Sequence, residues 1–195
     1  MHVQFEPISI NRQKDYLALL AKWNRTYNLT AVRDEAAMVG QHVLDSLAVL
    51  PWLTFDSLAD VGSGGGLPGI PLAIARPEAR VALVESNQKN AAFLQQAKIE
   101  LGLANVEVVQ ARAEGWRPEP LFDTVTSRAF SDLAEFLRLT SHLLAAGGVF
   151  AALKGVYPYE EIAQIPAGFT LDKVIPLTVP QLEGARHLVL IRKNP

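Results

Sequence analysis

The chain has 195 residues and contains no cysteine, which excludes disulfides, thiolate metal sites and cysteine nucleophiles. Its formal net charge of −2 provides no overall attraction to nucleic acid, so RNA binding would need a local group of basic side chains. No run approaches the roughly 20 apolar residues of a membrane helix, and the N-terminus lacks the apolar core of a signal peptide. We therefore expect a cytoplasmic protein without a membrane partner, folded as one domain over residues 1–195.

Two helical patterns open the chain. Residues 12–30 show an aromatic and apolar stripe at helical spacing, made of Tyr16, Leu20, Trp23 and Tyr27. Residues 35–50 predict a second helix, whose inward residues would be Val39, Val43, Leu47 and Leu50. We expect residues 1–50 to form a helical cap on a core at residues 51–195, with the aromatic side chains packed against it. Contact between the basic face of the first helix and nucleic acid remains the alternative.

Short apolar runs alternate with helical patterns after residue 50, which is typical of an α/β fold. Strands are predicted at 57–61, 80–85, 106–111, 122–127 and 148–154. Helices are predicted from Pro68 or Gly69 to Arg76, from Ser86 or Asn87 to Gly102, and from about Ser131 to Ala145, with Leu144 on the buried face of the last. Segments 172–179 and 186–193 predict two edge strands joined by a surface loop. The pattern predicts a doubly wound, mostly parallel sheet with antiparallel C-terminal edge strands and an N-terminal helical cap.

The turn after the first predicted strand carries the strongest chemical signal. The strand ends at Asp60 and Val61, and Gly62-Ser63-Gly64-Gly65-Gly66 follows directly. Glycines there permit positive φ angles and let a ligand approach the bare backbone. Glu85 ends the next strand, where an acidic side chain can accept hydrogen bonds from ribose hydroxyls. The combination predicts a nucleoside ligand at the carboxyl ends of the strands.

The spacing of the glycines distinguishes between nucleoside ligands. Read from Gly62, the third position of the dinucleotide fingerprint falls on Leu67, and the fingerprint returns only in a later frame from Gly64 to Gly69. No Gly-Lys-Ser or Gly-Lys-Thr follows, so a P-loop is excluded. S-adenosylmethionine has no phosphates and suits the earlier frame. Asp60 would orient the loop or contact the ligand's ammonium group, and bonding to the turn's own amides is an equal alternative.

Six segments of the chain together resemble one protein family. They are KWNRTYNLTAVRD (22–34), HVLDS (42–46), DVGSGGGLPGIPL (60–72), SRAF (127–130), ALKG (152–155) and GARHLVLIRK (184–193). The chain resembles the small-subunit ribosomal RNA guanine-N(7) methyltransferases, also called glucose-inhibited division protein B, over almost its whole length. Two features depart from the family pattern, because the first helix region is shorter and Gly65 stands where many members have proline.

The resemblance implies a Rossmann-like class I methyltransferase fold, S-adenosylmethionine as cofactor, and small-subunit (16S) ribosomal RNA or the small-subunit particle as partner. With the turn pattern, the expected cofactor-binding residues are Asp60, Gly62, Gly64, Gly66, Leu67, Glu85, Ala113, Glu114 and Arg128. The resemblance also implies basic residues around a substrate pocket. The expected RNA-binding residues are Arg112, Arg128, Arg186, Lys22 and Arg25, with Arg33 on the same basic surface. A salt bridge to a surface carboxylate is the alternative for Arg128.

Guanine N(7) carries a lone pair and no proton, so it can attack the methyl group of a sulfonium without a general base. Catalysis would then depend on aligning nucleophile, methyl group and sulfur, with Arg128 as the positioning residue and no dedicated acid or base. The absence of cysteine excludes cytosine C5 methylation. The SRAF segment also differs from the Asn/Asp-Pro-Pro-aromatic sequence of exocyclic-amine methyltransferases.

Three other functions remain alternatives at this stage: methyl transfer to a small molecule or protein, a nicotinamide-dependent oxidoreductase, and a non-catalytic module on ribosomal particles. Lys154, at the end of a strand, is a weaker candidate for phosphate contact, and a solvated edge lysine is at least as compatible with the pattern. His42 and Asp45, one helical turn apart, predict a hydrogen-bonded structural pair. The histidines show no spacing that indicates a metal site, so no metal is expected.

Overall fold

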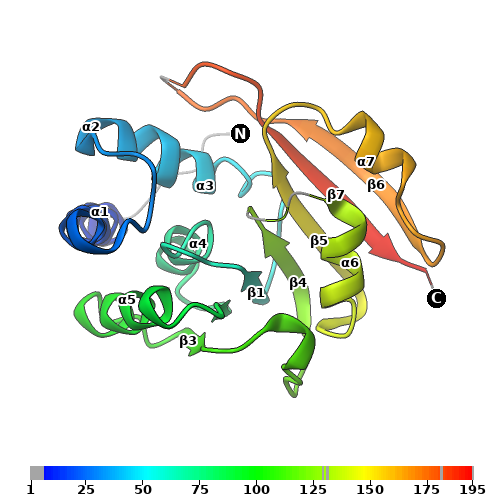
Figure 1. Ribbon diagram of the computed structural model, residues 1–195, viewed down its shortest axis with the longest axis horizontal. Coiled ribbons are helices and arrows are strands. Elements are labelled where there is room, and N and C mark those ends of the chain that lie inside the picture. The colour runs from blue at the N-terminus through cyan, green and yellow to red at the C-terminus, as the bar shows by residue number, and fades with distance from the viewer. Residues whose placement is uncertain (1–6, 129, 131, 181, 195) are drawn as a thin grey trace.

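The computed structural model describes residues 7–128, 130, 132–180 and 182–194. These residues form a twisted seven-stranded sheet in the order β3-β2-β1-β4-β5-β7-β6 (Figure 1). The strands are β1 (Ser57–Val61), β2 (Arg80–Val84), β3 (Val106–Val109), β4 (Phe122–Ser127), β5 (Leu144–Lys154), β6 (Phe169–Pro176) and β7 (His187–Lys193). β1 to β5 run parallel, whereas β7 pairs antiparallel with both β5 and β6. The predicted doubly wound sheet with antiparallel edge strands is confirmed.

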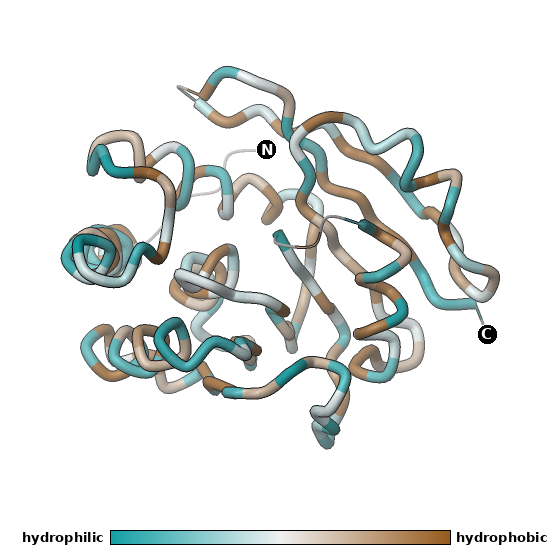
Figure 2. Tube along the Cα trace, in the orientation of Figure 1, coloured by the Kyte–Doolittle hydropathy of each residue, from teal (hydrophilic) through white to brown (hydrophobic). Residues whose placement is uncertain are grey.

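Helices cover both faces of the sheet (Figure 1). One face carries α1 (Pro7–Tyr27), α4 (Gly69–Ala75) and α5 (Gln88–Glu100), and the other carries α6 (Leu133–Thr140) and α7 (Tyr159–Ala163). Each face has its own buried core, the first including Tyr16 and Phe93 and the second Phe136 and Phe150. Figure 2 shows the matching hydrophobic segments along the strands and helices in the middle of the molecule. The N-terminal helix is therefore part of the packing of the sheet, because Tyr16 and Leu20 are fully buried.

Side-chain caps explain where two of the predicted helices begin. The Asn87 side chain accepts hydrogen bonds from the amides of Lys89 and Asn90 at the start of α5. Asp132 accepts from the amide of Glu135 at the start of α6. Gly102 follows α5 with a φ of 61°, as expected of a glycine C-cap.

The helix predicted from about Ser131 to Ala145 was wrong at its C-terminal end, because α6 spans Leu133–Thr140; Ser131 itself lies outside the described residues. A turn follows, in which the amide of Leu143 donates to the carbonyl of Thr140, and Leu144 then begins β5 opposite Phe122. Gly147 has a φ of 77° in an irregular stretch before regular pairing resumes. An apolar residue at position 144 suits either a helix face or a strand, so periodicity could not locate this boundary.

The second predicted helix was also wrong in detail. Residues 35–50 divide into α2 (Glu35–Met38), a π-helical segment η1 (Val39–Leu44) and α3 (Asp45–Leu47). A π-helical turn takes an extra residue, which rotates the following side chains relative to an α-helical stripe. Val39, expected to face inward, is 44% exposed, whereas Met38 and His42 are buried.

Smaller differences concern strand ends and one unexpected helix. β3 stops at Val109 instead of residue 111, and β6 begins at Phe169 and ends at Pro176 instead of spanning 172–179. α1 begins before the predicted residue 12 and ends at Tyr27. α7 was not predicted; it is a helix of only 5 residues that follows Tyr157 and Pro158.

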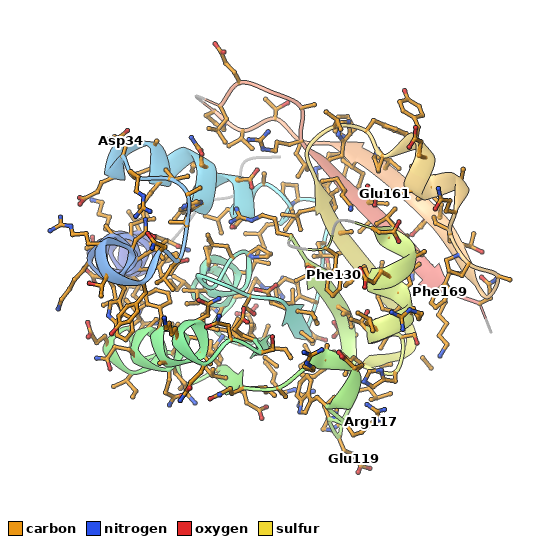
Figure 3. All side chains as sticks on the ribbon, in the orientation of Figure 1. Asp34, Arg117, Glu119, Phe130, Glu161 and Phe169 are labelled. Atoms are coloured by element: carbon orange, nitrogen blue, oxygen red, sulfur yellow. The ribbon has the colours of Figure 1, made fainter. Side chains whose placement is uncertain are left out.

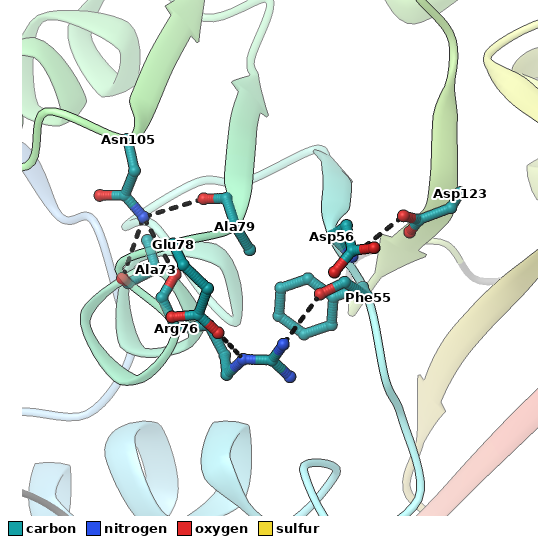
Figure 4. A network of polar contacts seen from close by, with 8 residues as sticks. All are labelled: Phe55, Asp56, Ala73, Arg76, Glu78, Ala79, Asn105 and Asp123. Atoms are coloured by element: carbon teal, nitrogen blue, oxygen red, sulfur yellow. Dashed lines mark hydrogen bonds and ion pairs between the residues drawn. The ribbon is translucent and has the colours of Figure 1, made fainter.

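A polar network secures the end of the sheet opposite the glycine turn (Figure 4). The Asn105 side-chain amide donates to the carbonyls of Ala73, Arg76 and Ala79 at 3.1, 3.2 and 3.1 Å, which joins the C-terminal end of α4 to the start of β2. Asp123 of β4 accepts from the amide of Asp56 at 3.0 Å, just before β1. These contacts connect the amino-terminal ends of the strands and leave their carboxyl ends to form the site.

Candidate functional site

The glycine turn, residues 62–66, joins β1 to α4 at the carboxyl edge of the sheet. Gly62, Gly64 and Gly66 have φ angles of 72°, 54° and 86°. A residue with a side chain would be strained in this backbone conformation. The amides of Gly62 and Ser63 both donate to the carbonyl of Val84, which fixes the turn against β2. A Cβ added at Gly69, the first residue of α4, would lie 2.7 Å from a carboxylate oxygen of Asp60. Glycine at these positions is therefore required by backbone conformation and by close helix–strand packing.

Two buried carboxylates hold this turn in place. Asp60 Oδ2 accepts from the amide of Gly69 at 2.9 Å, and Asp60 Oδ1 is buried without a hydrogen-bond partner among the described atoms. Burial raises the pKa of Asp60 to about 7 because desolvation disfavours the ionised carboxylate. Glu85 accepts from the amide of Gly64 at 2.9 Å through Oε2 and from that of Asn87 at 2.7 Å through Oε1. Glu85 thus bonds an amide of the turn itself, whereas Asp60 bonds the first amide of α4, just beyond the turn.

The N-terminal helix contacts the same turn through Tyr16. Its hydroxyl donates to the carbonyl of Gly65 at 2.6 Å, and the side chain is fully buried. Sequence analysis assigned Tyr16 to packing alone, because no local pattern pairs a helix tyrosine with a loop 49 residues away. The turn is thus held by its own strand, by β2 and by α1.

A cavity of about 310 Å³, which we call the strand-end cavity, opens beside the glycine turn. Its lining comes from the ends of four neighbouring strands and from α6: Val61, Gly62, Val84, Glu85, Ser86, Ala111, Arg112, Ala113, Glu114, Phe130 and Leu139. Helices α4 and α6, which follow β1 and β4, lie on opposite faces of the sheet. The cavity therefore occupies the topological switch point, where open α/β sheets bind ligands.

The expected cofactor residues divide between this lining and the wall behind it. Gly62, Glu85, Ala113 and Glu114 line the cavity, and Arg112 lies at its edge with its side chain 83% exposed. Asp60, Gly64, Gly66 and Leu67 are not among the described lining residues. They support the turn from behind, because Asp60 bonds α4 and Leu67 packs in the core.

Arg128 lies in a second, smaller cavity of about 130 Å³, which we call the arginine pocket. Its lining residues are Asp45, Arg128, Leu153, Lys154, Gly155, Leu177, Arg186 and His187. Asp45 Oδ2 lies 3.4 Å from Arg128 Nη1, and Asp45 Oδ1 lies 3.2 Å from Arg186 Nε. Arg128 also donates to the carbonyl of Gln41. One buried carboxylate thus holds two arginines that lie 58 residues apart in the sequence.

The predicted hydrogen bond between His42 and Asp45 is absent from the described contacts, because Asp45 bonds the two arginines instead. His42 Nε2 lies 3.0 Å from Thr30 Oγ1, and the ring is buried. Desolvation, with the nearby charge of Arg128, lowers the pKa of His42 below its usual value. The π-helical turn between the two residues removes the spacing on which the predicted pair depended.

Lys154 is neither a solvated edge lysine nor placed for phosphate contact. Its ammonium lies 2.7 Å from Glu161 of α7 and donates to the carbonyl of Phe130 at 3.0 Å. Glu161, labelled in Figure 3, also accepts from the amide of Leu133 at the start of α6. The short helix α7, which the sequence pattern did not indicate, therefore secures the wall between the two cavities.

The remaining basic residues lie elsewhere. Lys22 lies beside Asp15 and Glu100 over α1 and α5, and Arg25 forms an exposed ion pair with Glu35. Arg33 donates to the Asn24 carbonyl and to the Asn28 side chain. These contacts are local to the N-terminal segment, and Lys22, Arg25 and Arg33 are not among the described residues that line the arginine pocket.

Two properties of the described residues concern membranes and metals. None of the helices they form is long and apolar enough to cross a membrane. Within the same residues, no group of three histidine, aspartate or glutamate side chains is arranged to hold a metal ion.

Comparison with known proteins agrees with this geometry. A family model described as GidB, rRNA small subunit methyltransferase G, matches residues 9–189. Proteins named Ribosomal RNA small subunit methyltransferase G include one from Nitrosospira multiformis, 59% identical over 93% of this chain and 88% of that protein. Another, from Aromatoleum aromaticum, is 55% identical over 98% of this chain and 93% of that protein.

Solved structures show the same fold at low sequence identity. A SAM-dependent methyltransferase from Aquifex aeolicus superposes with a TM-score of 0.65 at 17% identity, covering 88% of this chain and 97% of that one. The DhpI–SAH complex gives a TM-score of 0.61 at 16% identity, covering 96% and 98%. The fold, the cavity at the switch point and the sequence match agree, and the chain belongs to the rRNA small subunit methyltransferase G family.

Proposed function

We propose that this chain transfers a methyl group from S-adenosylmethionine to N(7) of a guanine in small-subunit (16S) ribosomal RNA. The observation that carries the proposal is the strand-end cavity, lined by Gly62, Glu85 and Ala113 in a chain of this family. The protein would act in the cytoplasm, on the RNA or on the small-subunit particle. We further propose that residues 1–50 and 51–195 act as one domain, because α1 is packed against the core.

The lining of the strand-end cavity fits S-adenosylmethionine. A carboxylate has about four lone-pair sites, so Glu85 can accept from ribose hydroxyls while it still bonds the two backbone amides. Val84, Ala113 and Phe130 provide apolar surface for a base. When bound, S-adenosylmethionine supplies a methyl group activated by the positive sulfur. We assign Glu114 and Arg112 to the rim of the strand-end cavity, Glu114 as a cofactor contact and Arg112 as an RNA contact.

We assign the arginine pocket to binding of the acceptor RNA. Arg128 and Arg186 present guanidinium groups that can donate to a phosphate or to the O6 acceptor of guanine. Asp45 holds both in place before RNA arrives, which reduces the entropy lost on binding. N(7) attacks with its own lone pair and releases no proton, so the chain's task is alignment, an effect worth about 7–11 kcal/mol in favourable cases. Lys22 and Arg25 would contact RNA only outside this pocket.

Transfer of tritium from labelled S-adenosylmethionine tests the proposal. The substrates are small-subunit particles and 16S RNA from cells lacking this activity. We expect label in RNA, at a guanine whose chain becomes cleavable after borohydride and aniline treatment, as N(7)-methylation predicts. No incorporation into either substrate would refute the RNA assignment. Label in a ribosomal protein would favour a protein acceptor.

Two substitutions separate the cofactor and acceptor roles. Gly62→Val should weaken S-adenosylmethionine binding measured by calorimetry, because a branched side chain is strained at a φ of 72° and faces the cavity. Arg128→Ala should leave that affinity nearly unchanged and remove at least 90% of methyl transfer. Loss of cofactor affinity in Arg128→Ala would instead assign this arginine to the cofactor. Calorimetry with a nicotinamide dinucleotide tests the oxidoreductase alternative, which the family match does not favour.

A further inference from the structure

Two exposed tyrosines lie beside the arginine pocket. Tyr157 is 37% exposed and Tyr159 is 75% exposed, and Val156 before them is 77% exposed. They belong to the connection between β5 and α7, next to the start of β7 (Figure 1). Exposed aromatic side chains that gather at one place usually mark a binding surface. Tyr159 has most of its surface outside the core, and Tyr157 has more than a third of its surface exposed.

The two rings form an ordered surface. Their centroids lie 4.2 Å apart with an interplanar angle of 38°, and Tyr157 also meets the ring of His187 edge-on at 5.5 Å. The amide of Tyr159 donates to the carbonyl of Tyr157, and the buried Pro158 lies between them. The backbone of this turn is therefore fixed, and the rings are presented without a large loss of entropy on binding.

The surface continues into the arginine pocket. Gly155 and His187 line that pocket, and His187 Nδ1 lies 2.7 Å from the carbonyl of Gly155. Of the cationic side chains that line the pocket, Lys154 is paired with Glu161, whereas Arg128 and Arg186 share the single carboxylate of Asp45. The aromatic surface thus borders a pocket with excess positive charge, although the chain as a whole has a net charge of −2.

We infer that Tyr157 and Tyr159 form a stacking platform for an unpaired RNA base next to the methylated guanine, an inference that rests on the proposed function. Proteins recognise single-stranded RNA by stacking splayed bases on aromatic rings while cations bind the backbone. The juxtaposition of exposed tyrosines and paired arginines provides both elements. A nucleotide with its base on Tyr159 places the adjoining phosphate toward the arginine pocket. A guanine in such a strand is held near its reaction position by its neighbour.

Methyl-transfer kinetics on the RNA form that the wild-type chain modifies test this inference. The double variant Tyr157→Ala with Tyr159→Ala should raise KM for RNA by about 5- to 150-fold, the range that corresponds to removal of one base–aromatic stack. We expect kcat to change less than twofold and S-adenosylmethionine affinity to be unchanged. Tyr157→Phe with Tyr159→Phe keeps the rings and should behave as wild type.

Two further variants complete the test. Trp52→Ala removes a 55% exposed aromatic in the turn before β1, at the opposite end of the sheet, and should leave KM for RNA unchanged. Tyr159→Ala alone removes the more exposed ring and should still raise KM, which provides a result if the double variant melts at a lower temperature than wild type. A photoreactive benzophenone residue at position 159 should form adducts with RNA.

Several results would overturn the platform. KM within twofold of wild type in both alanine variants would exclude stacking, and equal losses in the alanine and phenylalanine pairs would assign the effect to the hydroxyl groups. Adducts with a ribosomal protein instead of RNA would make the surface a protein contact. These outcomes all require an active wild-type enzyme, whereas failure of the proposed function would appear as no methyl transfer by the wild-type chain.

Discussion

The two cavities at the carboxyl edge of the sheet are built in different ways. The strand-end cavity rests on backbone groups: Glu85 and Asp60 accept hydrogen bonds from amides of the glycine turn and α4. The arginine pocket rests on side chains, with Asp45 between Arg128 and Arg186. Backbone contacts hold the glycine turn and the start of α4 rigidly, and we call this unit, residues 60–70, the cradle. It tolerates few substitutions. Side chains in ion pairs can exchange their partner for a charged group of a ligand. Binding of a large and charged acceptor such as RNA requires this freedom.

The steric rigidity of the cradle should produce the largest effect. Gly66→Ala places a Cβ 2.8 Å from Ile70 Cγ1 at a φ of 86°. We expect it to lower the free energy of unfolding by about 3 kcal/mol, from overpacking and left-handed strain together. Gly102→Ala is a matched control, because its φ is 61° but nothing lies within 4 Å of the added Cβ. Urea denaturation should show a loss of only about 1 kcal/mol for the control, and equal losses would contradict a packed cradle.

The buried carboxylate of the cradle should make stability depend on pH. The folded-state pKa of Asp60 is about 7, above its usual 3.8, so the protonated form is favoured in the folded state. Its contribution is therefore complete below pH 4 and is lost as pH rises toward 7, by at most about 1.4 kcal/mol per pH unit. Asp60→Asn should flatten this part of the profile in urea denaturation at several pH values. The exposed Asp15→Asn control should keep the wild-type slope; a slope unchanged in Asp60→Asn would refute the assignment.

The arginine pocket should show a smaller loss of stability and a larger loss of function. Asp45→Asn removes the charge that holds Arg128 and Arg186, which are 28% and 30% exposed. Partial exposure lets water replace part of the interaction, so we expect a loss of about 2 kcal/mol and a tenfold or greater fall in methyl transfer. S-adenosylmethionine affinity should stay within twofold. Glu35→Gln, which breaks the exposed pair with Arg25, should change neither the stability nor the rate of methyl transfer. A comparable loss in Glu35→Gln would show that Asp45 has no special role.

The smallest expected effect concerns the contact between α1 and the cradle. Tyr16→Phe leaves the carbonyl of Gly65 without its hydroxyl donor in a buried place and should cost about 1 kcal/mol of stability. S-adenosylmethionine affinity should fall severalfold, because the turn gains freedom. Tyr27→Phe on the same helix, 43% exposed, is the control for both measurements. Cofactor affinity identical to wild type in Tyr16→Phe would show that β1 and β2 alone hold the turn.

Much of the fold could be predicted from local patterns. β4 and the first strand matched the predicted limits, because buried parallel strands are short apolar runs bounded by turn residues. The start of α5 followed from capping by Asn87. The boundary near Leu144 and the exposure of Val39 could not be predicted, since each depended on which partner strand or helical period the chain adopted.

The sequence by itself determined the glycine turn and its acidic partner, because positive φ angles and strand-end carboxylates are local properties that glycine and glutamate carry into any context. It also carried the family resemblance, through motifs spread over the chain. Only the tertiary structure decided what Asp45, Arg128 and Arg186 do, since their ion pairs join segments far apart in sequence. The same holds for Tyr16 beside Gly65 and for the tyrosines beside the arginine pocket. Electrostatic contacts depend on the distance between charged groups in space, and the local sequence pattern carries no information about that distance.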